Sequence, residues 1–290
     1  YMKRFPDGFF TVKANHYAGE SARRLNKAEE ALGYFRKVTQ APVGEHHINA
    51  WTWILRISSA RKNADEMLIA AESVLALSDD ASLLREANVA MMRGHQALKH
   101  LEVAYGYSEV VAADERNSPE VRTEAKANVA RNAMTIGMGS RTRKADFLSS
   151  WFESDLDAVQ RDWVTKSLNA YMDLKKNGPA VLQAEASYYQ ALILYLDGSH
   201  SASNEEIFWL IDNLPGQGEW RFKSLLVLAH NYDALDDKFQ ANYTLDFIIA
   251  ENFIAETVEQ AKVFQAILNT PAEDASGPAV DTIIETPTLP

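Results

Sequence analysis

The sequence contains no cysteine, and this absence excludes several kinds of chemistry at once. None of its 290 residues can form a disulfide, supply a thiolate to zinc or act as a cysteine nucleophile. Secreted domains can also lack cysteine, so the count leaves the cellular compartment open.

Long apolar runs and long basic runs are missing as well. No stretch is apolar enough to span a bilayer, and no signal peptide is visible, although the first residue is Tyr1 and a targeting signal upstream of it stays open. The 29 basic residues face 40 acidic residues, for a net charge of −11. We therefore expect no direct membrane insertion, and neither nucleic acid nor an anionic membrane as the main partner.

Helical periodicity dominates the chain, whereas the alternation typical of strands is scarce. Glycine and proline fall mostly between the periodic segments, as in 41–44, 117–119, 177–179 and 215–218, and these positions predict connections between helices. The expected helices are 14–25, 27–40, 46–60, 63–77, 81–97, 99–113, 119–137, 140–153, 156–176, 180–196, 201–213, 219–234, 237–250 and 254–268.

This periodicity divides the chain into three parts. Residues 1–13 are expected to form an N-terminal extension and residues 14–268 a continuous helical array. The remaining residues, 269–290, contain four prolines, four acidic residues and no basic residue. A segment of this composition is expected to be extended or disordered, or to dock on another surface.

One local phrase recurs along the chain, which indicates a repeated helical unit. Glutamate followed by alanine opens an amphipathic segment at Glu86, Glu124 and Glu185. The first two are 38 residues apart and the last two 61, so the second interval fits neither one unit nor two. We therefore predict a solenoid with an irregular unit near 139–176.

Residues 218–253 resemble the tetratricopeptide repeat (TPR), a helix-turn-helix of about 34 residues. The resemblance is carried by Leu225, Leu228, Ala229, Tyr232, Ala241, Leu245 and Ile248. It implies an all-α fold, a right-handed α-solenoid of about six or seven TPR-like units. Two departures from the pattern are visible: the Leu-Gly glycine is mostly replaced, and Ser108 stands where a phenylalanine is expected.

Four phrases resemble the C-terminal region of large multi-TPR proteins from the envelopes of Gram-negative bacteria. They are RTEAKANVARNA, QAEASYYQALILYLDG, EEIFWLIDNLP and GEWRFKSLLVLAHNYDALDDKFQANYTLDFIIAENF. The resemblance implies a non-catalytic scaffold that holds a barrel protein, a lipoprotein or a secretion component. It also implies a periplasmic location, possibly associated with the outer membrane, with the cytoplasm as the alternative.

In TPR arrays the first helix of each unit lines the concave groove, so its polar residues are candidate partner contacts. On the unit that begins at Pro119 these are Lys126, Asn128, Arg131 and Asn132. The alternatives are a solvated face, or a soluble peptide receptor or co-chaperone that binds short C-terminal segments in the groove.

Two tryptophans supply further candidate contacts. Trp51 and Trp53 are two residues apart and cannot share one helix face, so one of them is expected to be partly exposed.

Histidine pairs do not predict a metal site. Adjacent His46 and His47 point in different directions on a helix, and the five-residue separation of His95 and His100 does not align them. Neither pair has the i, i+4 spacing of a helical zinc site. We therefore predict no metal and no cofactor.

Adjacent acidic residues suggest helix capping more than acid–base catalysis. The four pairs are Glu29-Glu30, Asp79-Asp80, Glu205-Glu206 and Asp236-Asp237. Each is expected near the start of a helix, where carboxylates accept hydrogen bonds from free N–H groups. Because the sequence also lacks a Gly-rich phosphate loop and a nucleophile elbow, we predict no catalytic residues and no enzymatic activity.

Overall fold

The computed structural model describes residues 1, 4–5, 8–139, 148 and 156–270. In these residues the fold is all-α, with thirteen helices and no strand. The helices are α1 (Thr11–Arg24), α2 (Ala28–Thr39), α3 (His47–Ala60), α4 (Ala64–Leu77), α5 (Ala81–Ala97), α6 (Leu101–Ala113), α7 (Pro119–Met138), α8 (Ala158–Asn177), α9 (Ala180–Leu196), α10 (His200–Asn213), α11 (Gly218–Ala234), α12 (Lys238–Glu251) and α13 (Ala255–Leu268).

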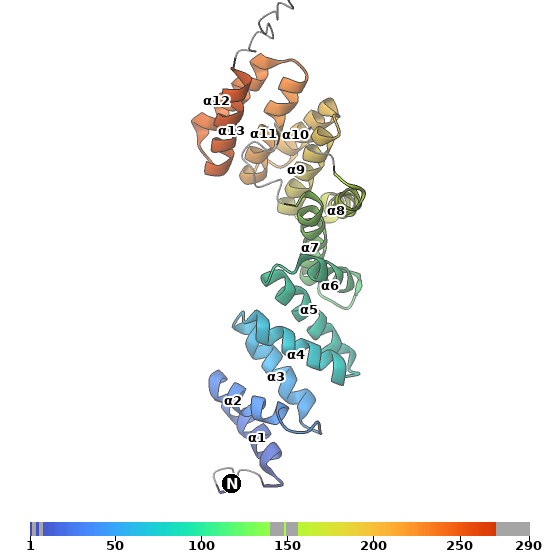
Figure 1. Ribbon diagram of the computed structural model, residues 1–290, viewed down its shortest axis with the longest axis vertical. Helices are drawn as coiled ribbons and strands as arrows, with labels where there is room; N and C mark the ends of the chain where they lie inside the picture. Colours follow the sequence, from blue (N-terminus) through green and yellow to red (C-terminus); the bar gives the residue numbers. More distant parts are fainter. Residues whose placement is uncertain (2–3, 6–7, 140–147, 149–155, 271–290) are drawn as a thin grey trace, which may run out of the picture.

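The helices are stacked in chain order along the long axis of the molecule, from α1 at one end to α12 and α13 at the other (Figure 1). Each helix packs against its neighbours in sequence, and α11 also contacts α9 and α13. This sequential packing is a repeat-like, solenoid-like arrangement of helical pairs, and the all-α prediction is confirmed.

Five of the helical pairs are closed by the same three-residue turn. The turns are residues 25–27, 61–63, 98–100, 197–199 and 235–237. The middle residue of each has a positive φ: Asn26, Lys62, Lys99, Gly198 and Asp236. The third residue donates its backbone N–H to the carbonyl five residues earlier, as in Lys27 to Ala22 at 2.9 Å and Asp237 to Tyr232 at 2.8 Å. Repetition of the unit is therefore visible in the backbone as well as in the sequence.

Lys99→Gly is expected to raise the free energy of unfolding by up to about 1 kcal/mol, because glycine adopts a positive φ without the steric cost that other residues carry. Lys99 has a φ of 59° and is exposed, so the change removes little else. Lys166→Gly, in the middle of α8, is the opposite control and should lower stability by at least about 1 kcal/mol, since it also removes the exposed ion pair to Asp162 and the cation–π contact with Trp163. Urea denaturation measures the free energy of unfolding of both variants. A decrease in that free energy for Lys99→Gly would contradict this account of the turn.

The segment predicted to be irregular, 139–176, contains the connection of the fourth helical pair, between α7 and α8. These two helices pack together as a pair, but their connection spans 139–157 where the other pairs have three residues. The long Glu124-to-Glu185 interval thus arises from extra residues inside one pair. The expected helix 140–153 falls outside the described residues except at Leu148. Each of the other thirteen expected helices overlaps an observed one.

The core consists of apolar clusters along the array. One large cluster is formed by residues of α1 to α5 and another mainly by residues of α7 to α13. Small residues allow the close approaches: Ala31, Ala104 and Ala241 are fully buried, and a Cβ added at Gly94 would lie 2.6 Å from Leu68 Cδ2. A core that runs along the stack leaves the helix faces on either side free to form extended surfaces.

Candidate functional site

A series of bidentate ion pairs joins four successive odd-numbered helices. In each pair an arginine of one helix donates two hydrogen bonds, of 2.5–2.9 Å, to a glutamate of the next odd-numbered helix. The pairs are Arg56 with Glu86 (α3 to α5), Arg93 with Glu124 (α5 to α7) and Arg131 with Glu185 (α7 to α9). In α5 and α7 the glutamate precedes the arginine by seven residues, or two turns, so one helix face carries both.

The three glutamates of this series are those of the repeated Glu-Ala phrase. The alanines that follow them, Ala87, Ala125 and Ala186, are fully buried. The phrase therefore combines an acceptor for the preceding unit with a close-packing position. Sequence reasoning missed the arginine partners because they lie 30, 31 and 54 residues away. The seven-residue spacing from Glu to Arg was the available signal.

Arg131 and Glu185 differ from the other two pairs in burial. The Glu185 side chain is 2% exposed, whereas the Glu86 and Glu124 side chains are 36% and 39% exposed. Tyr171 of α8 also donates its hydroxyl to Glu185, at 3.0 Å. The hydrogen bond to Glu185 raises the pKa of Arg131, and burial raises the pKa of Tyr171. This cluster fixes the α7–α8 pair, with its long connection, against α9.

A hollow of about 680 Å³ lies along α5, beside the first ion pair of the series. Its described lining includes four basic residues and one acidic residue: Arg56, Lys62, Arg85, Arg93 and Glu86. The protein as a whole has a net charge of −11, so this hollow differs from the rest of the molecule in sign. Arg56 and Arg93 are paired with Glu86 and Glu124, so Lys62 and Arg85 supply the positive charge that a negatively charged segment would meet there.

A second hollow, of about 250 Å³, lies between α7, α9, α11 and α13. Its lining is rich in sulfur and aromatic groups, among them Met134, Met138, Tyr188, Tyr189 and Trp220. Lys223 Nζ lies 4.5 Å from the centre of the Trp220 ring.

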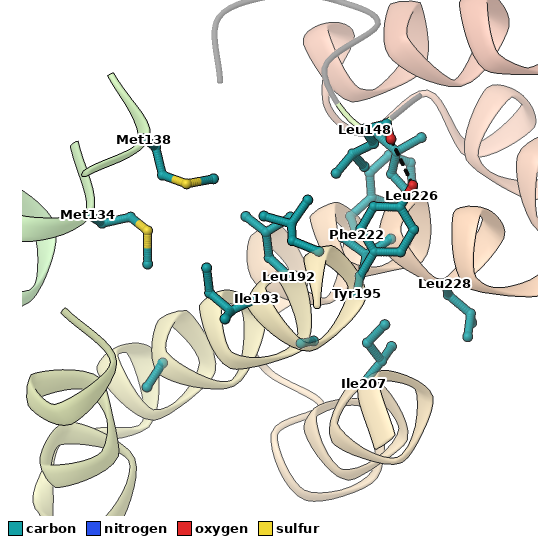
Figure 2. Packing of buried hydrophobic residues seen from close by; sticks show 14 of the residues in the cluster. Met134, Met138, Leu148, Leu192, Ile193, Tyr195, Ile207, Phe222, Leu226 and Leu228 are labelled. Carbon is teal, nitrogen blue, oxygen red and sulfur yellow. Dashed lines mark hydrogen bonds between the residues drawn. The ribbon is translucent and has the colours of Figure 1, made fainter. Parts of the chain in front are cut away.

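Leu148 occupies one side of this second hollow. Figure 2 shows Leu148 beside Tyr195, whose hydroxyl donates to the Leu148 carbonyl at 2.7 Å. Leu148 is 7% exposed and belongs to the same apolar cluster as the residues around it.

The four polar residues predicted on α7 do not form one exposed surface. Lys126 pairs with Asp173 at 2.6 Å, and Arg131 pairs with Glu185 as described. Asn128 and Asn132 are buried, and Asn132 Nδ2 donates to Gln96 Oε1 at 2.9 Å. Lys126 is half-buried and Arg131 is exposed, but both side chains are paired with neighbouring helices, and contact of these residues with a partner stays a prediction.

Both candidate tryptophans are partly exposed, and both pack against the N-terminal apolar cluster. Trp53 lies between two guanidinium groups, at 3.9 Å from Arg23 and 5.0 Å from Arg56, measured to the ring centre. Arg23 precedes Trp53 by 30 residues, the interval that separates Arg56 from Glu86. Trp53 thus takes the place that a glutamate holds in the next three units, and cation–π attraction replaces the ion pair. A partner contact at Trp51 or Trp53 stays a prediction.

The structure brings the rings of His95 and His100 together, contrary to the expectation from their spacing. Their Nδ1 atoms are 3.2 Å apart because the turn at Lys99 folds the chain back. By contrast, His47 is buried, and its ring bonds to the backbone at Ala41 and Gly44. Within the described ranges, no three histidine or acidic side chains are grouped so as to hold a metal ion.

Of the four acidic pairs, two cap helices as predicted, and Glu29-Glu30 lies at the start of its helix without capping it. Asp80 accepts from the N–H groups of Ser82 and Leu83, and Asp237 accepts from that of Gln240. Glu29 and Glu30 lie in the first turn of α2.

The prediction was wrong for Glu205 and Glu206. The helix that contains them, α10, begins at His200, so both lie inside it. Glu206 instead accepts a hydrogen bond from Lys175 of α8, at 2.5 Å. Glu206 thus links two even-numbered helices, α8 and α10, as Arg36 and Glu66 link α2 and α4.

Comparison with known proteins gives no family match and no match among curated proteins. In the part of the chain that the structure describes, no helix is both long enough and apolar enough to cross a membrane. What the geometry defines is therefore an all-α protein of sequential helical pairs, with an ion-paired series of odd-numbered helices and two hollows beside it.

Proposed function

We propose that the chain is a TPR-like right-handed superhelix that acts as a non-catalytic scaffold in a cell-envelope assembly. In this proposal its odd-numbered helices form the face that holds an extended segment of a partner protein. The Arg–Glu series from α3 to α9 carries the proposal, because it sets successive units in one register along a continuous surface.

The two hollows support binding of one partner segment at two separate places along this surface. The hollow along α5 has a basic lining, and the one between α7, α9, α11 and α13 has an aromatic lining with Lys223 and Glu256 among its charged groups. A segment with acidic residues followed by apolar ones would match both in order. Binding of this kind uses many weak contacts spread along a surface.

The envelope location rests on the resemblance of residues 180–268 to multi-TPR envelope proteins. It is tested by co-purification of the full chain from solubilised envelopes of a Gram-negative bacterium that carries it, followed by mass spectrometry. The expected result is enrichment of outer-membrane barrel proteins, lipoproteins or secretion components over an untagged control. Recovery of cytoplasmic proteins alone would contradict it.

The basic hollow along α5 favours a second candidate function, a receptor for short acidic peptides. Lys62 is exposed and Arg85 is half-buried there, and neither makes an ion pair within the described residues. A peptide receptor would bind isolated acidic peptides in solution, whereas a scaffold requires the assembled partner. Calorimetry with acidic peptides that end in a free carboxylate separates the two functions.

A further inference from the structure

Helix α12 carries an exposed aromatic row on its outer face. Phe239, Tyr243 and Phe247 are spaced four residues apart, so they lie along one side of the helix. They are 75%, 65% and 46% exposed, and Phe253, just after the helix, is 62% exposed. Single exposed apolar residues are common on protein surfaces, whereas a contiguous exposed apolar patch of this kind marks an interaction surface.

An apolar groove of about 360 Å³ runs beside this row, between α10, α11 and α12. Ile211, Phe222, Leu225, Phe247 and Phe253 line it. The row and the groove share Phe247 and Phe253 and form one surface, which we name the α12 surface.

One cationic side chain at the α12 surface, Arg221, has a donor without a partner among the described residues. Arg221 lines the groove, and its Nη1 donates to the carbonyl of Pro215 at 3.0 Å. Its Nε is buried and has no hydrogen-bond partner within the described residues. The Arg221 guanidinium lines the groove and carries a positive charge that a carboxylate of an occupant would pair with, so the surface favours aliphatic side chains next to an acidic one.

The chain beyond the last described residue begins next to this surface. Helix α13 runs back along α12, and Asn269 Nδ2 donates to Asn242 Oδ1 at 3.1 Å, close in sequence to Tyr243. From Thr270, thirteen residues of extended chain reach about 40 Å, whereas the 14 residues of α12 span about 21 Å. Residues 271–290 are therefore long enough to cover the whole surface.

The composition of this segment matches the α12 surface. It contains Val280, Ile283, Ile284 and Leu289, together with four acidic residues and no basic residue. Glu285 directly follows the two isoleucines. We propose that residues 280–289 dock on the α12 surface of their own chain, with Ile283 and Ile284 in the apolar groove and an acidic side chain at Arg221. This proposal is independent of what the odd-numbered helices bind.

Cysteine cross-linking tests the proposal cleanly, because the full chain contains no other cysteine. Glu251→Cys, at the groove, is combined with Thr286→Cys in the segment. The matched control combines Glu259→Cys, exposed on α13 near the same end of the hairpin, with Thr286→Cys. Docking is expected to make the intramolecular disulfide form at least about tenfold faster at residue 251 than at residue 259, since a tethered segment reaches millimolar effective concentration only where it binds.

The dependence on side chains gives a second readout. Ile283→Asp and Ile284→Asp are added to the chain that carries Glu251→Cys and Thr286→Cys. Its rate of disulfide formation should then fall to that of the control chain with Glu259→Cys. Equal rates at 251 and 259 in the parent chains would overturn the proposal. A disulfide that links two chains at the same position, seen as a dimer on a non-reducing gel, would also overturn it in favour of docking between copies.

Discussion

Arg131→Leu is expected to lower the free energy of unfolding by about 3 kcal/mol, the lower end of the range for removing one partner of a buried ion pair, because Glu185 is buried while the Arg131 side chain is 46% exposed. Its partner Glu185 is 2% exposed and, among the residues that the structure describes, would keep the Tyr171 hydroxyl as its one side-chain donor. The change leaves a buried carboxylate without a counter-charge, and desolvation makes that state costly. Urea denaturation followed by circular dichroism measures the loss.

A matched control separates burial from the mere presence of an ion pair. Arg93→Leu breaks the bidentate pair to Glu124, in which the side chains are 49% and 39% exposed. Solvent screens this pair, so the expected loss is about 0–1 kcal/mol. Adding Glu185→Gln to Arg131→Leu should recover part of the stability by removing the uncompensated charge. Similar losses for Arg131→Leu and Arg93→Leu would contradict the account of the α7–α9 junction.

The second large effect is a loss of stability in mild acid that depends on His230. This side chain is 5% exposed, stacks on Phe264 of α13 with the ring centres 3.5 Å apart, and lies 5.8 Å from Tyr195 of α9. Burial lowers the pKa of His230 to about 3. In the unfolded chain a histidine titrates near the ordinary pKa of about 6.5.

The sign of the effect follows from these two pKa values. Below pH 6.5 the unfolded chain binds a proton at His230 that the folded chain does not bind, so stability falls as the pH decreases towards 3. Between pH 7.5 and pH 5 this amounts to about 2 kcal/mol. We expect His230→Leu to remove this part of the loss.

The measurement compares the wild type and His230→Leu at pH 7.5 and pH 5. Burial also lowers the pKa values of His16 and His95, and both residues are present in both chains, so the difference isolates His230. An equal loss in the two chains would show that His230 is accessible to protons in the folded state.

Much of the fold follows from local sequence. Helix positions were predictable because apolar periodicity and Pro or Gly connections act within a few residues, as at Ser118 and Pro119, which begin α7 with a Ser118 cap. The repeated turn was harder to foresee, because four of its five left-handed residues are not glycine.

The candidate surface was less accessible to sequence reasoning. Arg131 and Lys126 were singled out as groove residues, but each pairs with an acidic residue 54 or 47 positions away. Asn132 is turned into the core towards Gln96 of the preceding odd-numbered helix. Such partners depend on how units stack, and the 61-residue interval between Glu124 and Glu185 concealed the regular spacing.

Binding of a partner segment by the face of the odd-numbered helices is the core of the proposed function. It is tested by comparing Ala97→Trp, which fills the hollow along α5, with Ala76→Trp on α4, since both alanines are exposed near the ends of their helices and only Ala97 lines that hollow. We predict that Ala97→Trp reduces the yield of co-purified envelope partners at least about tenfold, while Ala76→Trp leaves it unchanged. Equal yields from the two variants, with both chains folded, would contradict the claim.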